Sequence, residues 1–196
     1  IVSSQVKIHA KYGGVFPSLA KREHRRNLAP VLKKALEEAR LLNLKVKSQN
    51  SKLRFKIQNL NKTLSRKIDM IAVTVGPGLE PCLWTGINFA KELAEKMNLP
   101  IIPVNHIEAH ILANFLNSKF YILNSKSLFP AVCLVVSGGH TQLILMKGIG
   151  KYRILGETRD DAAGECFDKI ARILKLGYPG GPVISKLAKS ASDRGS

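Results

Sequence analysis

Residues 70–104 read MIAVTVGPGLEPCLWTGINFAKELAEKMNLPIIPV, and the order of patterns within them predicts a parallel β-sheet. The run at 70–75 is continuously apolar, which is typical of a strand buried on both faces. Apolar residues then recur at helical spacing over 83–97, and Pro100 separates that helix from a second apolar run at 101–104. A strand, a helix and a strand in this order indicate parallel pairing and an α/β fold class.

A long helix is expected before this stretch and a shorter one directly after it. The spacing of apolar residues predicts a helix from Pro17 to about residue 42. Pro30 should break or kink this helix, because proline has no N–H group to donate and its ring collides with the preceding turn. After the second strand, Asn105 can cap a helix that continues to about residue 117.

The C-terminal part of the sequence predicts a meander followed by two helices. Three apolar runs separated by glycine turns predict antiparallel strands at 131–136, 141–147 and 152–157. Asp160 or Asp161 is expected to cap the next helix. The inward face of that helix should consist of Ala163, Phe167, Ile170 and Leu174. A tight loop at 178–182 and a last helix from Val183 complete the pattern.

The charge balance narrows the classes of partner. The chain of 196 residues carries 31 Lys and Arg against 14 Asp and Glu, a formal net charge of +17. Such an excess favours polyanions, nucleic acid above all, or an anionic surface. Residues 44–67 hold eight Lys and Arg and no acidic residue, so we interpret them as a basic insertion or loop. The predicted helix from Pro17 adds a basic face that carries Lys21, Arg22, Arg25 and Arg26.

The cysteine count and the hydropathy pattern bear on location. Three cysteines without a CxxC pair argue against a disulfide framework and for a reducing compartment, here the cytoplasm. No stretch approaches the roughly 18 apolar residues of a membrane span. No signal-peptide pattern opens the chain, so no membrane partner is expected. The first residue is Ile1, which we interpret as a processed N-terminus or a piece of a longer protein.

Two histidines stand one helical turn apart in the segment HIEAH, residues 106–110. At this spacing the imidazoles of His106 and His110 can reach one metal ion, and a third ligand has to come from elsewhere. The alternative is a pair of partly exposed helical histidines. Glu108 lies roughly 200° around the helix from His106, so the segment does not match the HExxH pattern of zinc proteases.

Three further patterns suit an anionic or hydroxyl-bearing ligand. The apolar run at 131–136 leads into Ser137-Gly138-Gly139, where glycine amides can approach an anion because no Cβ blocks them. Asp168 lies off the apolar stripe of its helix and can bind ribose or other hydroxyl groups. Gly180 and Gly181 precede a helix and can contact a nucleotide. The plain alternatives are a hairpin turn, a solvated ion pair from Asp168 to Arg172, and an ordinary loop.

Together these segments resemble one family, the tRNA threonylcarbamoyladenosine transferases, called TsaD in bacteria. The resemblance rests on five stretches that follow one another in order through most of the chain. They are SSQVKIHAKYGGVFPSLAKREHRRNLAPVL (3–32), VTVGPGLEPCLWTGINFAK (73–91), IIPVNHIEAH (101–110), VVSGGHTQLILMKGIGKYRILGETRDDAAGECFDK (135–169) and LGYPGGPVISKLA (176–188). Residues 44–67 are the divergent part.

The resemblance implies a fold and an activity. The fold is ASKHA, the architecture of actin, Hsp70 and sugar kinases, and residues 1–196 would be an incomplete domain that holds most of the first lobe only. The activity is transfer of the threonylcarbamoyl group from threonylcarbamoyl-AMP to the exocyclic amine of the adenosine 3′ of the anticodon in tRNA. No catalytic residue is assigned. Substrate-binding positions of the family match Val135, Val136, Ser137, Gly138, Gly139, Asp168 and Gly181.

The resemblance also implies a metal and partners. The family's metal-binding histidines match His106 and His110, which implies one divalent metal ion, with iron expected and zinc as the alternative. Family members work with partner subunits, and they extend into a second lobe that supplies a third metal ligand and a substrate-binding asparagine. The chain by itself is therefore expected to be inactive. Ser185 stands where many members carry aspartate, so that contact is not carried over.

Other classes of function stay open on the residues alone. A small-molecule kinase of the ASKHA type would share the fold but needs no histidine pair. A non-catalytic, basic nucleic-acid-binding module would make residues 44–67 the functional segment and the histidine pair dispensable. A metalloprotease is disfavoured by the position of Glu108.

Overall fold

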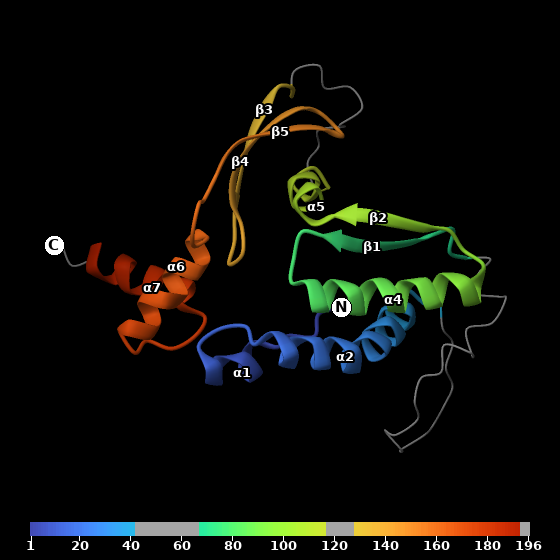
Figure 1. The fold of residues 1–196 in the computed structure, drawn as a ribbon, viewed down its shortest axis with the longest axis horizontal. Helices are drawn as coiled ribbons and strands as arrows, with labels where there is room; N and C mark the ends of the chain where they lie inside the picture. The colour runs from blue at the N-terminus through green and yellow to red at the C-terminus, as the bar shows by residue number, and fades with distance from the viewer. Residues whose placement is uncertain (42–66, 117–127, 193–196) are drawn as a thin grey trace. The chain divides into compact units, whose positions relative to one another are not determined.

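The structure is a computed structural model that describes residues 1–41, 67–116 and 128–192 (Figure 1). The described chain has the α/β composition that the sequence predicts. It divides into two compact units: unit 1 is Ile1–Gln5 with Phe16–His106, and unit 2 is Val6–Val15 with Ile107–Ser196. The basic segment 44–67 lies outside the described residues except for Lys67. No helix of the described residues is long and apolar enough to span a membrane.

Unit 1 is built on the predicted parallel pair of strands. β1 (Ile71–Gly76) pairs in parallel with β2 (Ile101–Asn105), and α4 (Glu80–Met97) forms the crossover between them. The helix begins three residues before the predicted position, with Pro81 in its first turn, where a missing N–H costs nothing. The expectation that the first strand is buried on both faces is wrong for the described residues, because Ala72 and Val75 are exposed.

The core of unit 1 lies between α4 and α2 (Pro17–Glu38). Leu36 of α2 is buried against Leu93 and Met97 of α4, which stand four residues apart and therefore on one helix face. Partly buried apolar residues complete this core: Leu32, Leu41, Ile68, Ile71, Phe89 and Leu99. The regularly spaced apolar residues of α4 thus face the core, as the sequence predicts.

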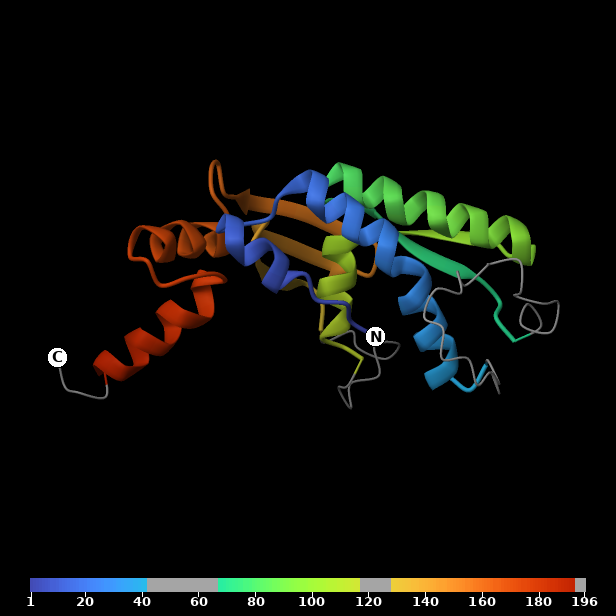
Figure 2. The same cartoon turned by 90° about the horizontal axis from the view of Figure 1, so that it is seen from below.

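Of the break or kink expected at Pro30, the break does not occur. α2 runs without interruption from Pro17 to Glu38, as Figure 2 shows, with Pro30 inside it. Pro30 and Arg26 are both exposed. The Arg26 carbonyl, whose helical donor Pro30 cannot supply, therefore lies where water can bind it. The packing of Leu36 on α4 keeps the second half of the helix in place.

Unit 2 contains the predicted antiparallel meander. β3 (Ala131–Val136), β4 (Thr141–Gly148) and β5 (Lys151–Glu157) form a sheet in that order, and both pairs are antiparallel. α5 (His106–Ala113) covers one face of the sheet, where Ile107 and Ile111 form a buried cluster with Ile144 and Met146. Unit 2 also contains α1 (Val6–His9) and the short helix η1 (Ala10–Tyr12).

Alternation along β3 separates the two faces of this sheet. Ala131, Cys133 and Val135 pack on the cluster beneath α5. Val132, Leu134 and Val136 point to the opposite face and are exposed among the described residues. Burial raises the pKa of the Cys133 thiol, which favours its protonated form.

The inward face predicted for α6 (Ala163–Ile173) is wrong. Residues expected inside are exposed in the described chain: Phe167 by 45%, Ile170 by 42% and Leu174 by 59%. The side that packs carries Gly164, Asp168 and Ala171, at the i, i+4, i+7 spacing of one face. Small and polar residues occupy this face because α6 rests on backbone atoms, of the β3–β4 turn and of the start of α7 (Gly180–Ser192).

The continuity of α2 makes Pro30 a site where the helix can be improved. Pro30→Ala restores one N–H donor and removes a steric conflict, so it should raise the free energy of unfolding by roughly 1–3 kcal/mol. Pro17→Ala is the matched control, because the first helical residue has no intrahelical acceptor for its N–H and the change should be near zero. Denaturant unfolding monitored by circular dichroism measures both. A lower stability for Pro30→Ala would contradict a regular helix at this position.

Candidate substrate and metal site

The turn between β3 and β4 is fixed by Ser137. The Ser137 N–H donates to the His140 carbonyl oxygen at 2.8 Å, which closes the hairpin. The Ser137 hydroxyl oxygen accepts the His140 N–H at 3.0 Å and the Gly139 N–H at 3.3 Å. The predicted glycine turn is therefore a hairpin turn with its own internal acceptor. Of the valines assigned by resemblance to substrate, Val135 packs in the core and Val136 is exposed.

The N-terminus of α6 lies directly against this turn. The Gly164 N–H donates to the Ser137 carbonyl oxygen at 3.1 Å. The Ala163 N–H donates to the Thr141 hydroxyl oxygen at 2.9 Å. A Cβ at Gly164 would lie 2.8 Å from both the Gly138 Cα and the Ser137 oxygen, so only glycine permits this approach.

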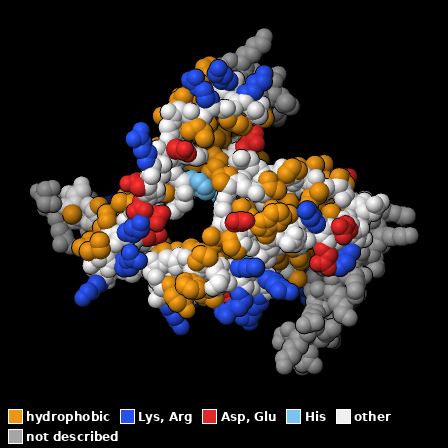
Figure 3. All heavy atoms as spheres, viewed as in Figure 1, with side chains coloured by type: hydrophobic (Ala, Val, Ile, Leu, Met, Phe, Trp, Pro, Cys, Tyr) orange, Lys and Arg blue, Asp and Glu red, His pale blue; other side chains and the backbone are white. Residues whose placement is uncertain are grey.

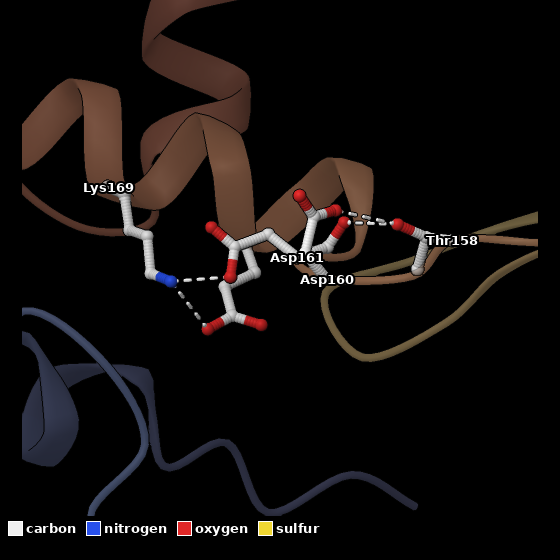
Figure 4. A network of polar contacts seen from close by, with 5 residues as sticks. Thr158, Asp160, Asp161 and Lys169 are labelled. Carbon is white, nitrogen blue, oxygen red and sulfur yellow. Dashed lines mark hydrogen bonds and ion pairs between the residues drawn. The ribbon is translucent and has the colours of Figure 1, made fainter.

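The expected cap at Asp160 or Asp161 is therefore wrong. The N-cap residue of α6 is Ala162, whose side chain has no acceptor, and the hydroxyl of Thr141 in β4 bonds the first helical N–H instead. Figure 4 shows what the two aspartates do. Thr158 donates to Asp160, and Asp161 pairs with Lys169 on α6. The hydrogen bonds that Lys169 makes to Asp161 and then to Glu165 raise the pKa of its amine.

Asp168 joins α6 to the start of α7. Its Oδ1 accepts the Gly180 N–H at 2.7 Å, so the expected solvated pair with Arg172 is not the contact that this carboxylate makes. α7 begins at Gly180, three residues before the predicted start, so the last three residues of the loop expected at 178–182 form the first turn of the helix. Burial, and then the Asp168 charge, raise the pKa of the Tyr178 phenol beside it.

Close packing distinguishes the two glycines of this turn. Gly180 is buried, and a Cβ there would lie 2.5 Å from both the Ala171 Cβ and the Phe167 carbonyl oxygen. At Gly181, assigned by resemblance to substrate, nothing in the described chain lies within 4 Å of a Cβ position. The structure thus assigns the helix contact to Gly180 and leaves Gly181 with an open side.

Part of the sequence-predicted substrate set therefore meets at α6. The helix touches the Ser137–Gly139 turn at its first residues, carries Asp168 one turn later, and binds Gly180, the residue before Gly181, at the start of α7. Sequence reasoning missed two residues that build this arrangement, Thr141 and Gly164. It expected Gly180 to contact a nucleotide, whereas the Gly180 N–H bonds Asp168. A glycine inside a predicted helix, as at Gly164, is the one signal that points to a close backbone contact.

The two histidines predicted to bind a metal lie one turn apart on one helix, as their spacing predicts. His106 is the first residue of α5 and His110 follows one turn later, the first half-buried and the second exposed. Two imidazoles form a partial ligand set that suits iron or zinc. Within residues 1–41, 67–116 and 128–192, no group of three or more His, Cys, Asp or Glu is placed to hold a metal ion. Glu108 lies near the Tyr152 hydroxyl, and burial together with this carboxylate raises the pKa of that phenol.

Comparison with known proteins identifies the family. The sequence profile described as "TsaD: tRNA N6-adenosine threonylcarbamoyltransferase" matches residues 1–48 and 52–195. Curated proteins of that name are 49% identical over 193 residues in Persephonella marina and 47% identical over 192 residues in Clostridium kluyveri. The chain belongs to the tRNA N6-adenosine threonylcarbamoyltransferase family. Each alignment covers 98% of this chain and 48% of the relative, so the chain spans about half the length of these relatives.

The two glycines of the α7 start offer a matched test of the packing. Gly180→Ala should lower the free energy of unfolding by about 1–3 kcal/mol, because the new Cβ collides with the Ala171 side chain and the Phe167 backbone. Gly181→Ala, one residue further, has room for its methyl group and should change stability little. Urea unfolding of both variants gives the comparison. Equal stabilities would mean that α7 does not lie this close to α6.

Proposed function

We propose that the protein containing this chain transfers a threonylcarbamoyl group from threonylcarbamoyl-AMP to the exocyclic amine of the adenosine 3′ of the anticodon in tRNA. One observation carries the proposal: α6 contacts the Ser137–Gly139 turn, carries Asp168 and binds Gly180, the residue before Gly181, and the family resemblance assigns the turn, Asp168 and Gly181 to substrate. An ASKHA fold, with this chain as an incomplete domain, belongs to the same proposal. A cytoplasmic location follows from tRNA as the proposed substrate.

The described side chains suit the nucleotide part of the acyl donor. A carboxylate accepts up to about four hydrogen bonds, so the bond from Gly180 leaves Asp168 able to accept from a ribose hydroxyl. The glycine amides at 138 and 139 suit a phosphate, since no Cβ blocks their approach and no Cβ at either position would meet a neighbour within 4 Å. Gly181 leaves open space at the start of α7, where a substrate can lie against the backbone.

The proposed reaction is an acyl transfer. The adenosine amine attacks the carbamoyl carbon, a carbon–nitrogen bond forms, and the bond from that carbon to the phosphate oxygen breaks. AMP leaves with the electron pair, and the amine nitrogen loses one proton. The residues described here would bind and orient the AMP portion, which converts the encounter of amine and acyl group into a step of fixed geometry.

His106 and His110 would hold the proposed divalent metal ion, iron or zinc, together with a ligand from outside the described residues. When bound, such an ion acts as a Lewis acid on an oxygen of the acyl donor. Their placement one turn apart on α5 keeps both imidazoles at the same side of the helix, while Glu108 lies toward Tyr152.

The charge of the chain suits tRNA as the acceptor. Figure 3 shows Lys and Arg side chains gathered along α2, where Lys21, Arg22, Arg25 and Arg26 are exposed. The one acid among them, Glu23, is buried and bonds Arg22 at 3.5 Å. Such a face binds phosphate backbones with an affinity that falls steeply with salt. Residues 44–67, almost wholly outside the described residues, are proposed to add further phosphate contacts.

Two alternatives predict different outcomes for the same protein. A small-molecule kinase of the ASKHA type would transfer phosphate without tRNA. A non-catalytic nucleic-acid-binding module would bind tRNA and be indifferent to changes at Asp168 or Gly181. The convergence of these segments on α6 favours an enzyme that binds a nucleotide over a non-catalytic basic module, and the transfer assay separates that enzyme from a kinase.

The direct test is transfer by the full-length protein encoded in the reading frame that contains this chain. With threonylcarbamoyl-AMP, tRNA and the family's partner subunits, mass spectrometry should detect modified adenosine. Gly181→Ala should lower kcat/KM by about tenfold or more at unchanged stability, because its methyl group enters the space left for substrate. Gly86→Ala, also in open space but on α4, is the control.

The 196-residue chain alone is expected to be inactive in this assay, because the resemblance places a metal ligand and a substrate contact outside it. Phosphate transfer without tRNA, or tRNA binding with no modification by the full-length protein, would each reject the proposed function in favour of one alternative. Modification by the chain alone at the full-length rate would show that its residues hold a complete site.

The metal proposal has its own test. Full-length protein should contain stoichiometric iron or zinc by elemental analysis, and His110→Ala should lose most of it, because one imidazole of the pair is removed. His24→Ala, a change to a histidine of α2 that bonds the Ala20 carbonyl, should keep the metal. Equal metal content in the His110 and His24 variants would remove the assignment.

A further inference from the structure

We propose that Thr141 and Gly164 are positioning residues, which hold the Ser137–Gly139 turn against α6 and thereby set its place relative to Asp168. The inference rests on the proposed function, since it concerns how the proposed substrate residues are held. Neither side chain is assigned to substrate by the resemblance. Thr141 acts through the first N–H group of α6, and Gly164 through the absence of a side chain.

Thr141 makes one bond to the start of α6 and a second bond to Thr158, in the segment between β5 and α6. Its hydroxyl oxygen accepts the Ala163 N–H at 2.9 Å, and its backbone oxygen accepts the Thr158 N–H at 3.0 Å. Thr158 in turn donates from its hydroxyl to the Asp161 carbonyl oxygen at 2.8 Å. The N-cap residue Ala162 has no acceptor of its own, so Thr141 performs the capping from another strand.

Gly164 controls how closely the turn approaches. Its N–H bonds the Ser137 carbonyl oxygen at 3.1 Å, and an added Cβ would lie 2.8 Å from the Gly138 Cα and 2.9 Å from the Gly138 nitrogen. These neighbours are backbone atoms, which cannot rotate out of the way as a side chain can. Any larger residue at 164 therefore moves the turn away from α6.

The helix transmits this contact to Asp168. Gly164 and Asp168 are four residues apart, one turn of α6, so both face the same side. A helix rises about 1.5 Å per residue, which fixes the Asp168 position at about 6 Å along the axis from Gly164. Asp168 is itself held at the Gly180 N–H. If the turn moves relative to Gly164, its separation from the carboxylate changes, although both groups remain intact.

Thr141→Val and Thr141→Ser isolate the hydroxyl. In the full-length protein, Thr141→Val should raise KM for threonylcarbamoyl-AMP about fivefold, the factor that corresponds to loss of a typical helix cap, with a smaller change in kcat. Thr141→Ser keeps the hydroxyl and should restore the parent value. Hydrogen exchange of a peptide covering residues 135–143 should quicken in the valine variant alone.

Gly164→Ala tests the close approach independently. It should raise KM by about tenfold or more, because small misplacements of binding groups cost large factors. Gly86→Ala is the control, since Gly86 is also inside a helix but has open space around it. Thermal unfolding of each variant shows whether it folds.

Three outcomes decide the inference. Parent-like KM and parent-like exchange in both Thr141→Val and Gly164→Ala would overturn it. Faster exchange with parent-like KM would show a structural cap without a positioning role, and would also overturn it. If the parent protein transfers no threonylcarbamoyl group, the proposed function fails. The exchange measurement then still tests the contact, and AMP titration of the parent and Thr141→Val by calorimetry replaces KM.

Discussion

Backbone atoms of unit 2 approach α6 at both of its ends more closely than any residue with a Cβ would allow. Gly164 meets the β3–β4 turn at the first helical residues, and Gly180 meets the second half of the helix from α7. These two approaches bring together segments that lie more than forty positions apart in the printed sequence, the turn at 137–139 and the glycines at 180–181. The candidate substrate site depends on close backbone contacts that are possible because these two glycines have no side chain.

Most of the regular structure was predictable because it follows from side chains that repeat over short distances. The apolar runs of β1, β2 and the three-stranded meander lie where the patterns place them, and their pairing is parallel in one unit and antiparallel in the other as predicted. Ile107 and Ile111 face the core as the spacing of α5 requires. The break expected at Pro30 does not occur, because the cost of a proline is local, whereas the packing of Leu36 on α4 holds the second half of the helix.

The errors at α6 have a common physical origin. Its apolar stripe is the best local indication of an inward face, yet the described contacts lie along Gly164, Asp168 and Ala171. Its cap comes from Thr141, 22 positions earlier, and no local pattern shows which strand will lie there. The positions of the two histidines on α5 followed from the period of a helix alone. The candidate substrate residues were assigned by the resemblance, because no spacing rule identifies them. The periodicity of a single sequence does not show which segments, distant in the chain, make backbone contacts with one another.

The hydroxyl of Ser137 would compete with a bound anion for the amide groups of the turn. It accepts hydrogen bonds from the amides of Gly139 and His140, so the turn carries a built-in substitute for an anion. A phosphate that bound the Gly139 amide would exchange one acceptor for another and gain only the difference between a hydroxyl oxygen and a charged one. The turn would then bind a charged acceptor more strongly than a neutral one. A neutral ligand of similar size would gain little binding free energy there. Such a site distinguishes charged from neutral ligands because the ligand has to displace the Ser137 hydroxyl from the amides. No additional residue is required.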